Sequence, residues 1–426
     1  MDEPLLPPSL AQELSEIGPV DILVGIPSFN NARTIGHVVR AVQAGFAKYF
    51  PDQRTLLLNS DGGSTDATQE VVRTTSLADF GTVLAAHPIH GVHRIVTPYH
   101  GVPGKGSALR TVFAAAKAVT ASACAVVDAD LRSITPEWLD LLISPVLRQG
   151  FDFVAPLYRR HKYDGTITNS IVYPLTRALY GKRVRQPIGG DFGFSGTLAS
   201  NFLEHNAWHS DVARFGIDIW MTTTAITSGS RVCQSFLGAK IHDVKDPGVD
   251  LSAMLTQVVS SVFTLMENHE PLWRSVRDSE AVPLFGFEHT VGLEPIRVDV
   301  GRMLGVFRSG ARDLSAIWER ILAPETFASV QGLTRAGDDR FRFPADLWVQ
   351  VIYDFAVAHH KPAMNRDHLL RSLTPLYLGR TASFINETAD ADAEQVEDVI
   401  EGTCQEFESL KAYLVERWNG LQGGES

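Results

Sequence analysis

The sequence contains few cysteines. Its 426 residues include only Cys124, Cys233 and Cys404, which lie far apart along the chain. An odd number of widely spaced cysteines does not form a disulfide framework, and the absence of any Cys-x-x-Cys pair argues against a structural zinc site. Because this usage is typical of proteins in a reducing compartment, we expect a cytoplasmic protein.

Long apolar runs and dense basic segments are lacking as well. No apolar stretch approaches the ~20 residues that a transmembrane helix requires. Residues 1–20 carry acids and prolines where a signal peptide has a basic segment and an apolar core. The formal net charge is -11 at pH 7, whereas nucleic-acid-binding proteins usually carry a basic patch. We therefore expect no membrane and no nucleic-acid partner.

The composition is that of a globular protein with a sizeable core. Hydrophobic residues make up 44% of the chain and charged residues 20%, which is ordinary for a soluble domain. A chain of this length is too long for one ordinary core. The sequence therefore predicts two domains, or one large domain with an extension, with a boundary near Asp246–Asp250.

The two predicted domains have different textures. Up to residue 246, short apolar runs alternate with helical patterns, which predicts an α/β domain with a mostly parallel sheet, Rossmann-like in layout. From residue 247 to 426, apolar residues recur at three- and four-residue steps, which predicts a mostly α-helical domain. The expected strands are 21–26, 55–58, 94–97 and 123–127, and the expected C-terminal helices are 251–266, 303–321, 347–358, 368–377 and 393–418.

Polar motifs follow the expected strands, at the sheet edge where ligands of such folds bind. Asp128-Ala129-Asp130 places two carboxylates directly after the fourth strand. This spacing suits a hard divalent cation and a pyrophosphate, whose charge the metal neutralises as the nucleotide leaves. The alternative is a pair of solvated turn aspartates.

A glycine-rich segment with Lys105 precedes the next expected helix. Glycines at positions 101, 104 and 106 allow the backbone to approach a phosphate, and Lys105 supplies a positive charge. The spacing is not that of a Walker loop, and an ordinary loop with an exposed lysine is the alternative. Asp61, after the second strand, is a candidate acceptor for a base or ribose, while Ser64, Thr65 and Asp66 are expected to cap the following helix.

Two later motifs are less specific on their own. The turn Gly189-Gly190-Asp191 combines glycines with an acid and predicts a sugar pocket, with a tight loop as the alternative. His242 follows a short apolar stretch, and a lone histidine in such a place is more often structural than a ligand.

Together these motifs resemble glycosyltransferase family 81, over residues 21–247. This family consists of retaining enzymes with the GT-A fold and includes glucosyl-3-phosphoglycerate synthases and glucosylglycerate synthases. The motifs occur here in the family's order: Ile26-Pro27-Ser28-Phe29-Asn30, Ser64-Thr65-Asp66-Ala67-Thr68, Pro103-Gly104-Lys105-Gly106, Asp128-Ala129-Asp130, Gly189-Gly190-Asp191 and His242.

The resemblance implies a role for each matching position. It implies a Mg²⁺ or Mn²⁺ ion bound by Asp130 and His242, contact of Lys105 with the donor diphosphate, and Asp218 near the transferred sugar. The implied donor-binding residues are Pro27, Phe29, Asn31, Asp61, Gly62, Lys105 and Asp128, and the implied acceptor-binding residues are Gly165, Thr166, Thr168, Gly190 and Asp191.

Two departures from the family shape the expected substrate. Family members often have Glu where this chain has Asn31, and the phosphoglycerate enzymes have Arg where it has Thr166. A guanidinium grips a phosphate through paired, charged hydrogen bonds, which a threonine hydroxyl does not supply. The sequence therefore predicts transfer of glucose from a nucleoside-diphosphate glucose to D-glycerate, which would give α-glucosylglycerate, a compatible solute or polysaccharide precursor.

Several alternatives stay open at this point. Arg159, Arg160 or Lys162 can supply a phosphate site, which would favour 3-phosphoglycerate as acceptor. An inverting family-2 transferase and a non-enzymatic sugar-nucleotide sensor are the other two interpretations. The density of apolar helices over residues 251–418 also predicts a homo-oligomer, with a simple intrachain core as the alternative.

Overall fold

The protein forms two compact units, each built from separate stretches of the chain. The computed structural model describes residues 5–75, 93–98, 104–205, 208, 216–241, 252–289, 291–292, 296–361 and 364–420. The first unit comprises Met1–Arg159, Val184–Val244 and Val282–Leu293, and the second comprises Arg160–Arg183, Lys245–Ala281 and Glu294–Ser426. A single cut after residue 246 therefore does not describe this division, because Arg160–Arg183 and Val282–Leu293 each belong with the other half.

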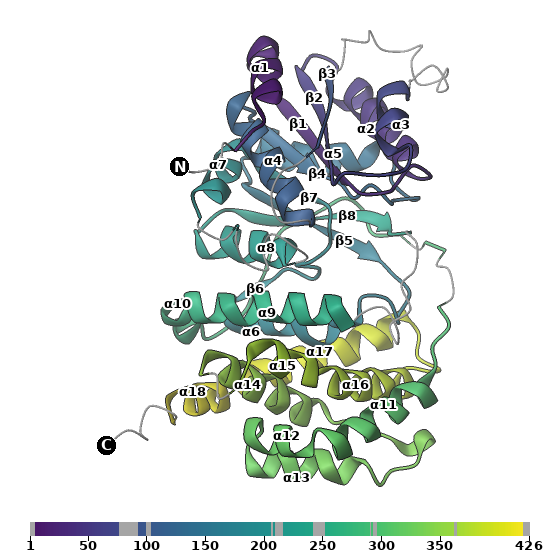
Figure 1. Ribbon diagram of the computed structural model, residues 1–426, viewed down its shortest axis with the longest axis vertical. Coiled ribbons are helices and arrows are strands. Elements are labelled where there is room, and N and C mark those ends of the chain that lie inside the picture. The colour runs from purple at the N-terminus through teal and green to yellow at the C-terminus, as the bar shows by residue number, and fades with distance from the viewer. Residues whose placement is uncertain are drawn as a thin grey trace. The chain divides into compact units, whose positions relative to one another are not determined.

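The first unit is organised around one mostly parallel sheet, as the sequence predicts (Figure 1). Only β7 runs antiparallel to its neighbours β4 and β5. β1 and β2 are almost entirely buried, which is expected where helices cover both faces of a parallel sheet. The strand order is β10 (Leu284–Phe285), β8 (Val232–Ala239), β5 (Phe153–Arg159), β7 (Phe192–Ser195), β4 (Ala123–Val126), β1 (Ile22–Ser28), β2 (Thr55–Asp61) and β3 (His93–Pro98).

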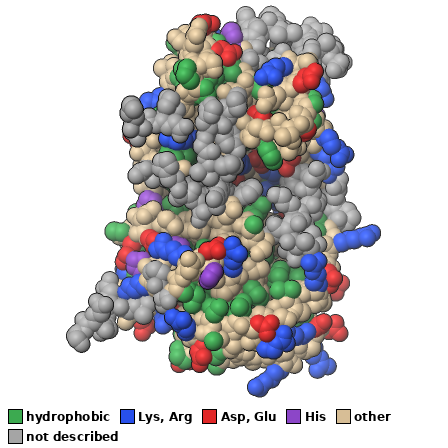
Figure 2. All heavy atoms as spheres, viewed as in Figure 1, with side chains coloured by type: hydrophobic (Ala, Val, Ile, Leu, Met, Phe, Trp, Pro, Cys, Tyr) green, Lys and Arg blue, Asp and Glu red, His purple; other side chains and the backbone are tan. Residues whose placement is uncertain are grey.

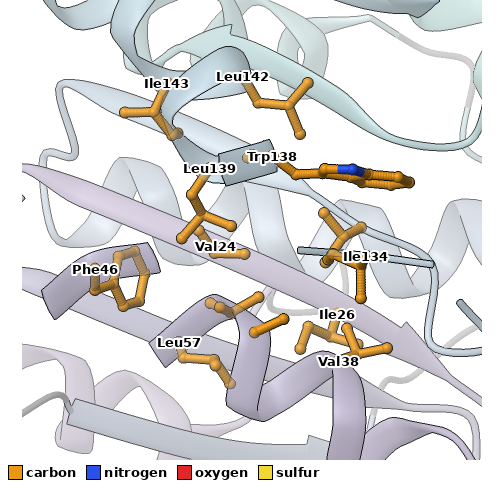
Figure 3. Close-up of a cluster of buried hydrophobic side chains, with 14 of the residues drawn as sticks. Val24, Ile26, Val38, Phe46, Leu57, Ile134, Trp138, Leu139, Leu142 and Ile143 are labelled. Atoms are coloured by element: carbon orange, nitrogen blue, oxygen red, sulfur yellow. The ribbon is translucent and has the colours of Figure 1, made fainter. Parts of the chain in front are cut away.

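Apolar side chains from two helices fill the core on one face of this sheet. Val38 and Phe46 of α2, and Leu139 and Leu142 of α5, pack with Val24 of β1 and are at most 2% exposed (Figure 3). Burying one such side chain stabilises a fold by about 1.5–3 kcal/mol. The helices of this unit are α1 (Pro8–Ile17), α2 (Ile35–Tyr49), α3 (Thr68–Thr74), α4 (Lys105–Ala118), α5 (Glu137–Gln149), α7 (Gly196–Glu204) and α8 (Ile217–Thr227).

The antiparallel strand β7 was not predicted, and its sequence explains why it fits there. A Cβ atom on Gly193 would lie 2.0 Å from the carbonyl oxygen of Leu142 in α5. Only glycine therefore allows the helix to pass so close to the strand. The short run Phe192–Ser195 carries no alternating pattern long enough to mark a strand.

The second unit is helical, as predicted for the C-terminal half. It also holds a two-stranded sheet of β6 (Lys182–Arg183) and β9 (Glu280–Ala281). Its helices are η3 (a π-helix, Thr168–Val172), α6 (Tyr173–Tyr180), α9 (Ser252–Asn268), α10 (Glu270–Ser275), α11 (Val300–Asp313), α12 (Ser315–Ile321), α13 (Pro324–Leu333), η5 (Asp338–Arg340), α14 (Ala345–His360), α15 (Arg366–Ser372), α16 (Thr374–Glu387), α17 (Ala393–Ser409) and α18 (Lys411–Gly420).

Three predicted helices are broken into shorter ones. The expected helix 303–321 is interrupted at Leu314, the helix 393–418 at Leu410, and the helix 368–377 at Leu373. In the last case Pro375 lies in the first turn of α16. A proline is favourable there but lacks the N–H that a continuous helix needs.

The apolar residues of α14 serve a core within the second unit. Trp348, Val349, Val351, Ile352 and Phe355 are all 0% exposed. An intrachain core thus accounts for the many apolar residues in this helix. Self-association of the chain stays a prediction. No helix among the described residues has both the length and the apolar character needed to cross a membrane. On the face that Figure 2 shows, basic and acidic side chains are interspersed.

Ion pairs with one buried partner join several helices of this unit. Arg177 of α6 is 2% exposed and donates to Glu401 at 2.5 Å and to Glu408 at 2.8 Å, both on α17. Asp354 of α14 is fully buried and accepts hydrogen bonds from Arg417 and Tyr413 of α18, at 2.9 and 2.8 Å. Each of these charged groups therefore has its partners within the unit.

Candidate active site

The first unit brings the predicted polar motifs to one edge of its sheet. β1 pairs in parallel with β2 and with β4, so their carboxyl ends lie side by side. Ser28 ends β1 opposite Asp61 at the end of β2, and Asp128 lies two residues beyond β4. This is the edge at which open α/β sheets bind their ligands.

Asp61 is fully buried and organises the turn after β2. Its carboxylate accepts hydrogen bonds from the hydroxyls of Ser28 and Ser64, from the backbone N–H groups of Gly63 and Ser64, and from Gln69, at 2.6–3.0 Å. Burial raises the pKa of Asp61, but the hydrogen bonds from Ser64 and Gln69 outweigh it and lower the pKa below its ordinary value. Asp61 is thus a charged structural centre, and its contact with a nucleoside stays a prediction.

The other residues expected to hold a nucleoside surround this turn. Phe29 exposes 59% of its surface, and its backbone N–H donates to the side chain of Asn31 at 2.8 Å. The N–H of Gly62 donates to the carbonyl of Ser28 at 2.7 Å. Pro27 precedes Ser28 in β1. An exposed aromatic ring beside a rigid turn can stack on a base.

Lys105 lies between two aspartates at the beginning of α4. Its Nζ is 2.7 Å from Oδ1 of Asp128 and 3.2 Å from Oδ1 of Asp218, and it donates to the carbonyl of Gly190 at 3.1 Å. Asp218 comes from the first turn of α8, 113 residues further along the chain. The structure therefore joins Lys105 and Asp128, which strand-end motifs predicted at one sheet edge, with Asp218, which only the family resemblance supplied.

A second lysine, Lys240, lies beside this cluster and was missed in the sequence. Its Nζ is 2.9 Å from Oδ2 of Asp128 and 2.8 Å from Oδ2 of Asp191, and it donates to the carbonyl of Gly189 at 2.8 Å. Lys240 directly follows β8, and a single lysine after a strand carries no motif that would have singled it out. Its proximity to the predicted His242 was the only available signal.

Asp191 is fully buried beneath Asp128. Its Oδ1 accepts the backbone N–H of Asp128 at 2.7 Å, and its Oδ2 accepts the hydroxyl of Tyr158 as well as Lys240. Both oxygens thus have partners inside the unit. The acceptor contact expected of Asp191 stays a prediction, and the structure gives this side chain a second task in holding Asp128.

The charges of the cluster shift the pKa values of its members in opposite directions. Burial alone would raise the pKa of Asp128, but Lys105 and Lys240 hold it well below its ordinary value. Burial would lower the pKa of Lys105, but Asp128 and Asp218 raise it. The pKa of Asp218 is raised, because burial outweighs the attraction of Lys105.

One oxygen of Asp218 stands out in this arrangement. Oδ1 lies within ion-pair distance of Lys105, yet it is buried and receives no well-aligned hydrogen bond. The hydrogen bond from Lys105 goes to the other oxygen, Oδ2, at 3.4 Å. A buried carboxylate oxygen without a hydrogen bond is ready to accept one from a ligand.

The predicted metal ligands are only partly within the described residues. Asp130 lies half-buried in the turn after β4, whereas His242 lies outside the described residues. Within the described part of the chain, no three His, Cys, Asp or Glu side chains are grouped as a ready metal site. A carboxylate oxygen nevertheless suits Mg²⁺ or Mn²⁺, which commonly takes one or two protein carboxylates and completes its shell with phosphate oxygens and water. Asp130 fits that pattern.

The predicted acceptor loop belongs to the second unit. Gly165 has a positive φ of 70°, and Thr168 begins the π-helix η3. Thr166 is 4% exposed and shares a hydrogen bond with the hydroxyl of Tyr377. The Thr166 hydroxyl is therefore already engaged, and its role toward an acceptor stays a prediction.

The cations near this loop have partners of their own. Arg160 lies 3.6 Å from Asp164, and Arg159, in the first unit, lies 2.6 Å from Glu288. Lys162 donates to three backbone carbonyls after α16, those of Thr388, Ala389 and Ala391. Arg159 and Lys162 thus have partners at hydrogen-bond distance, and Arg160 has an ion pair at 3.6 Å.

Comparisons with known proteins agree with the fold of the first unit. Residues 23–199 match the family model described as glycosyl transferase family 2, and no curated protein matches the chain. Among solved structures, the chain is similar to glucosyl-3-phosphoglycerate synthase from Mycobacterium tuberculosis in complex with Mn²⁺, UDP and glucosyl-3-phosphoglycerate, at 21% identity and a TM-score of 0.43, with 63% of this chain and 85% of that one covered.

The structure of the same enzyme in complex with Mn²⁺, UDP-glucose and phosphoglyceric acid is similar at 21% identity and a TM-score of 0.43. The match covers 62% of this chain and 86% of that one. Similarity at this level does not transfer an activity. The family model and the mostly parallel sheet of the first unit together confirm the predicted GT-A architecture. The chain thus carries a glycosyltransferase domain and is an enzyme of nucleotide-sugar chemistry.

Proposed function

We propose that the chain is a retaining, metal-dependent transferase of family 81 that moves glucose from a nucleoside-diphosphate glucose to D-glycerate. The observation that carries the proposal is the position of Lys105 between Asp128 and Asp218 at the carboxyl edge of the parallel sheet. A cation and carboxylates at this edge are the groups that a diphosphate, its metal ion and a sugar require.

On the donor side, Lys105 would bind the diphosphate as a point charge. Its ion pairs with Asp128 and Asp218 hold the ammonium group in place before the donor arrives. Asp130 and His242 would hold the Mg²⁺ or Mn²⁺ ion, which supplies neutralising charge to the leaving diphosphate when bound. Phe29 would stack on the base beside the turn of Asp61.

Asp218 is the best candidate for orienting the reacting hydroxyl or the transferred sugar. Its buried Oδ1 lacks a hydrogen bond, which a sugar or acceptor hydroxyl would supply. In a retaining transfer, the acceptor oxygen bonds to the anomeric carbon on the face from which the diphosphate leaves. The acceptor proton passes to the departing diphosphate oxygen, so Asp218 has no need to act as an inverting base.

The preference for D-glycerate follows from the cost of burying a phosphate. A dianionic phosphate removed from water needs several strong donors. Thr166 supplies one hydroxyl, which already contacts Tyr377, and the nearby cations Arg160 and Lys162 already have partners. A glycerate carboxylate carries less charge and requires fewer donors.

An acceptor screen tests this proposal. The protein is incubated with UDP-, GDP- or ADP-glucose, with Mn²⁺ or Mg²⁺, and with D-glycerate or 3-phosphoglycerate, and the anomeric coupling of the product is read by NMR. We expect an α-linked product with D-glycerate as the better acceptor. A β-linked product would establish the inverting alternative, and a preference for 3-phosphoglycerate would overturn the acceptor assignment alone. Nucleotide binding without turnover of any donor would favour the sensor.

A further inference from the structure

Five charged side chains in the first unit form a chain of alternating sign. Asp191 contacts Lys240 at 2.8 Å, Lys240 contacts Asp128 at 2.9 Å, Asp128 contacts Lys105 at 2.7 Å, and Lys105 contacts Asp218 at 3.2 Å. Both cations therefore lie between two carboxylates, and Asp128 lies between two cations.

The two halves of this chain differ in their access to solvent. The side chains of Asp191 and Lys240 are 0% and 5% exposed, whereas those of Lys105, Asp128 and Asp218 are 16%, 22% and 13% exposed. A ligand at the sheet edge can therefore reach the outer three residues. The inner two lie behind Asp128, away from solvent.

The inner pair is fully hydrogen-bonded within the unit. Lys105 also has three oxygen partners, so burial is the property that separates the two lysines. Lys240 has three N–H protons and three oxygen partners, namely Asp128, Asp191 and the carbonyl of Gly189. Asp191 accepts from the backbone of Asp128, from Tyr158 and from Lys240. Asp128 is thus held twice, through its backbone N–H and through its carboxylate.

The glycine turn leaves no room for a ligand beside this pair. A Cβ atom on Gly190 would lie 2.2 Å from Oδ2 of Asp128 and 2.9 Å from Nζ of Lys240, and Gly190 has a φ of 92°. The backbone thus closes directly over the contact between Asp128 and Lys240. Glycine at position 190 allows the backbone to lie this close to Asp128 and Lys240, and the turn therefore leaves no open pocket at this point.

We propose that Lys240 and Asp191 are positioning residues, which hold Asp128 and, through it, place Lys105 for the donor diphosphate without touching the substrate. This inference rests on the proposed function of Lys105. If Lys240 instead contacted the donor directly, its contribution to nucleotide binding would be independent of Lys105. The two cases therefore differ in how substitutions at the two lysines combine.

A double-mutant cycle on nucleotide binding separates these cases. UDP, GDP and ADP are first compared by calorimetry on the wild-type protein with Mn²⁺, and the tightest is then used with Lys240→Met, Lys105→Ala and the double variant. We expect Lys240→Met to weaken binding by about 10- to 100-fold, as is usual for residues that orient a ligand-binding group. In the Lys105→Ala background, the added Lys240→Met substitution should weaken nucleotide binding less than about 3-fold. The single variant Lys240→Arg keeps the positive charge and should bind nucleotide nearly as tightly as the wild-type protein.

Matched controls separate positioning from loss of folding. Lys411→Met removes a half-buried lysine that also donates to backbone carbonyls, those of Ala178 and Val276 in the second unit. It should lower the unfolding temperature without changing nucleotide affinity. If Lys240→Met does not fold, Asp191→Asn replaces it in the cycle, since it keeps the size of the side chain. Full additivity of the Lys240 and Lys105 substitutions would overturn the inference, and so would wild-type affinity in Lys240→Met. A wild-type protein that binds no nucleotide at all would instead refute the proposed function.

Discussion

The two units bury charged side chains in different ways. In the second unit, Arg177 pairs with two glutamates of α17, and Asp354 has three donors from the chain. In the first unit, the buried charges converge on one sheet edge, and Oδ1 of Asp218 is left without a hydrogen bond. Arg177 and Asp354 of the second unit thus have several partners within that unit, whereas Asp218 of the first unit has an oxygen that can accept a hydrogen bond from a ligand.

This contrast separates ion pairs that support the fold from ion pairs that prepare a site. A buried charge whose partner is removed is strongly destabilising, because its desolvation is no longer offset. Substitutions in the second unit should therefore change stability, whereas those at the outer edge of the first unit should change ligand binding. The predictions below test this division.

The largest effect on stability is expected at Arg177. Arg177→Met would remove the buried guanidinium that contacts Glu401 and Glu408. Because these two carboxylates are 42% and 28% exposed and become solvated, the free energy of unfolding should fall by about 1.5–3 kcal/mol, as for the loss of a charged hydrogen bond. Urea unfolding followed by tryptophan fluorescence measures this loss. Arg183→Met, at an exposed position on β6, is the matched control and should cost little. Reduced nucleotide affinity in folded Arg177→Met would contradict the division between the units.

The next effect concerns Asp130 and leaves stability unchanged. Asp130→Asn removes a hard anionic ligand, so metal-dependent turnover should fall by more than about 100-fold, a loss comparable to that of other single electrostatic groups in active sites. Turnover is measured as a function of Mn²⁺ concentration. Asp140→Asn in α5 keeps the same chemistry away from the sheet edge and should retain activity. Near-wild-type turnover of Asp130→Asn in the presence of a chelator would exclude the metal role.

A smaller effect is expected at Lys105. Lys105→Ala should weaken binding of the nucleoside diphosphate by about 10- to 100-fold, which corresponds to one charged hydrogen bond of about 1.5–3 kcal/mol. Calorimetry gives the affinity. A retained cooperative unfolding transition shows that the fold is intact, although its midpoint should fall because Asp218 loses its ion pair. Lys117→Ala, on the exposed end of α4, provides the comparison. Equal affinities of the two variants would remove Lys105 from the donor site.

The smallest effect is a pH dependence at Lys411. Burial lowers the pKa of Lys411 to about 8, from an ordinary value of 10.5. Between these values the unfolded chain binds more protons than the folded protein, so stability should rise as the pH increases from about 8 to 10.5. The gain should be on the order of 1 kcal/mol after solvent screening. Unfolding of wild type and Lys411→Met is compared across this range, and parallel pH profiles would show that Lys411 does not titrate there.

The sequence predicted the periodic parts of the structure well. Alternating strands and helices gave the parallel sheet, and strand-end motifs placed Asp61 and Asp128 at one edge. Local patterns of this kind arise from burial, which repeats along each element. The helix breaks at Leu314 and Leu410 have no such signal, because apolar spacing continues through both.

Long-range pairing was the part that sequence patterns did not reveal. Lys240 and Asp128 are 112 residues apart, and nothing near Lys240 indicates that its charge is neutralised by two distant aspartates. The glycine-rich segment supplied Lys105 and the family resemblance supplied Asp218, but neither showed that Asp191 is fully buried. A tight loop was the stated alternative for the Gly189-Gly190-Asp191 turn, and the close approach at Gly190 supports that alternative.

The interrupted order of the two units also has a consequence for how the chain is made. The first unit needs Val282–Leu293, and the second needs Arg160–Arg183, so each waits for sequence that lies beyond a stretch of the other. During synthesis, the segment Arg160–Arg183 emerges more than 200 residues before α17, whose Glu401 and Glu408 receive Arg177. Arg177 therefore cannot form these two ion pairs until nearly the whole protein has been translated, and a fragment ending at residue 246 lacks both glutamates.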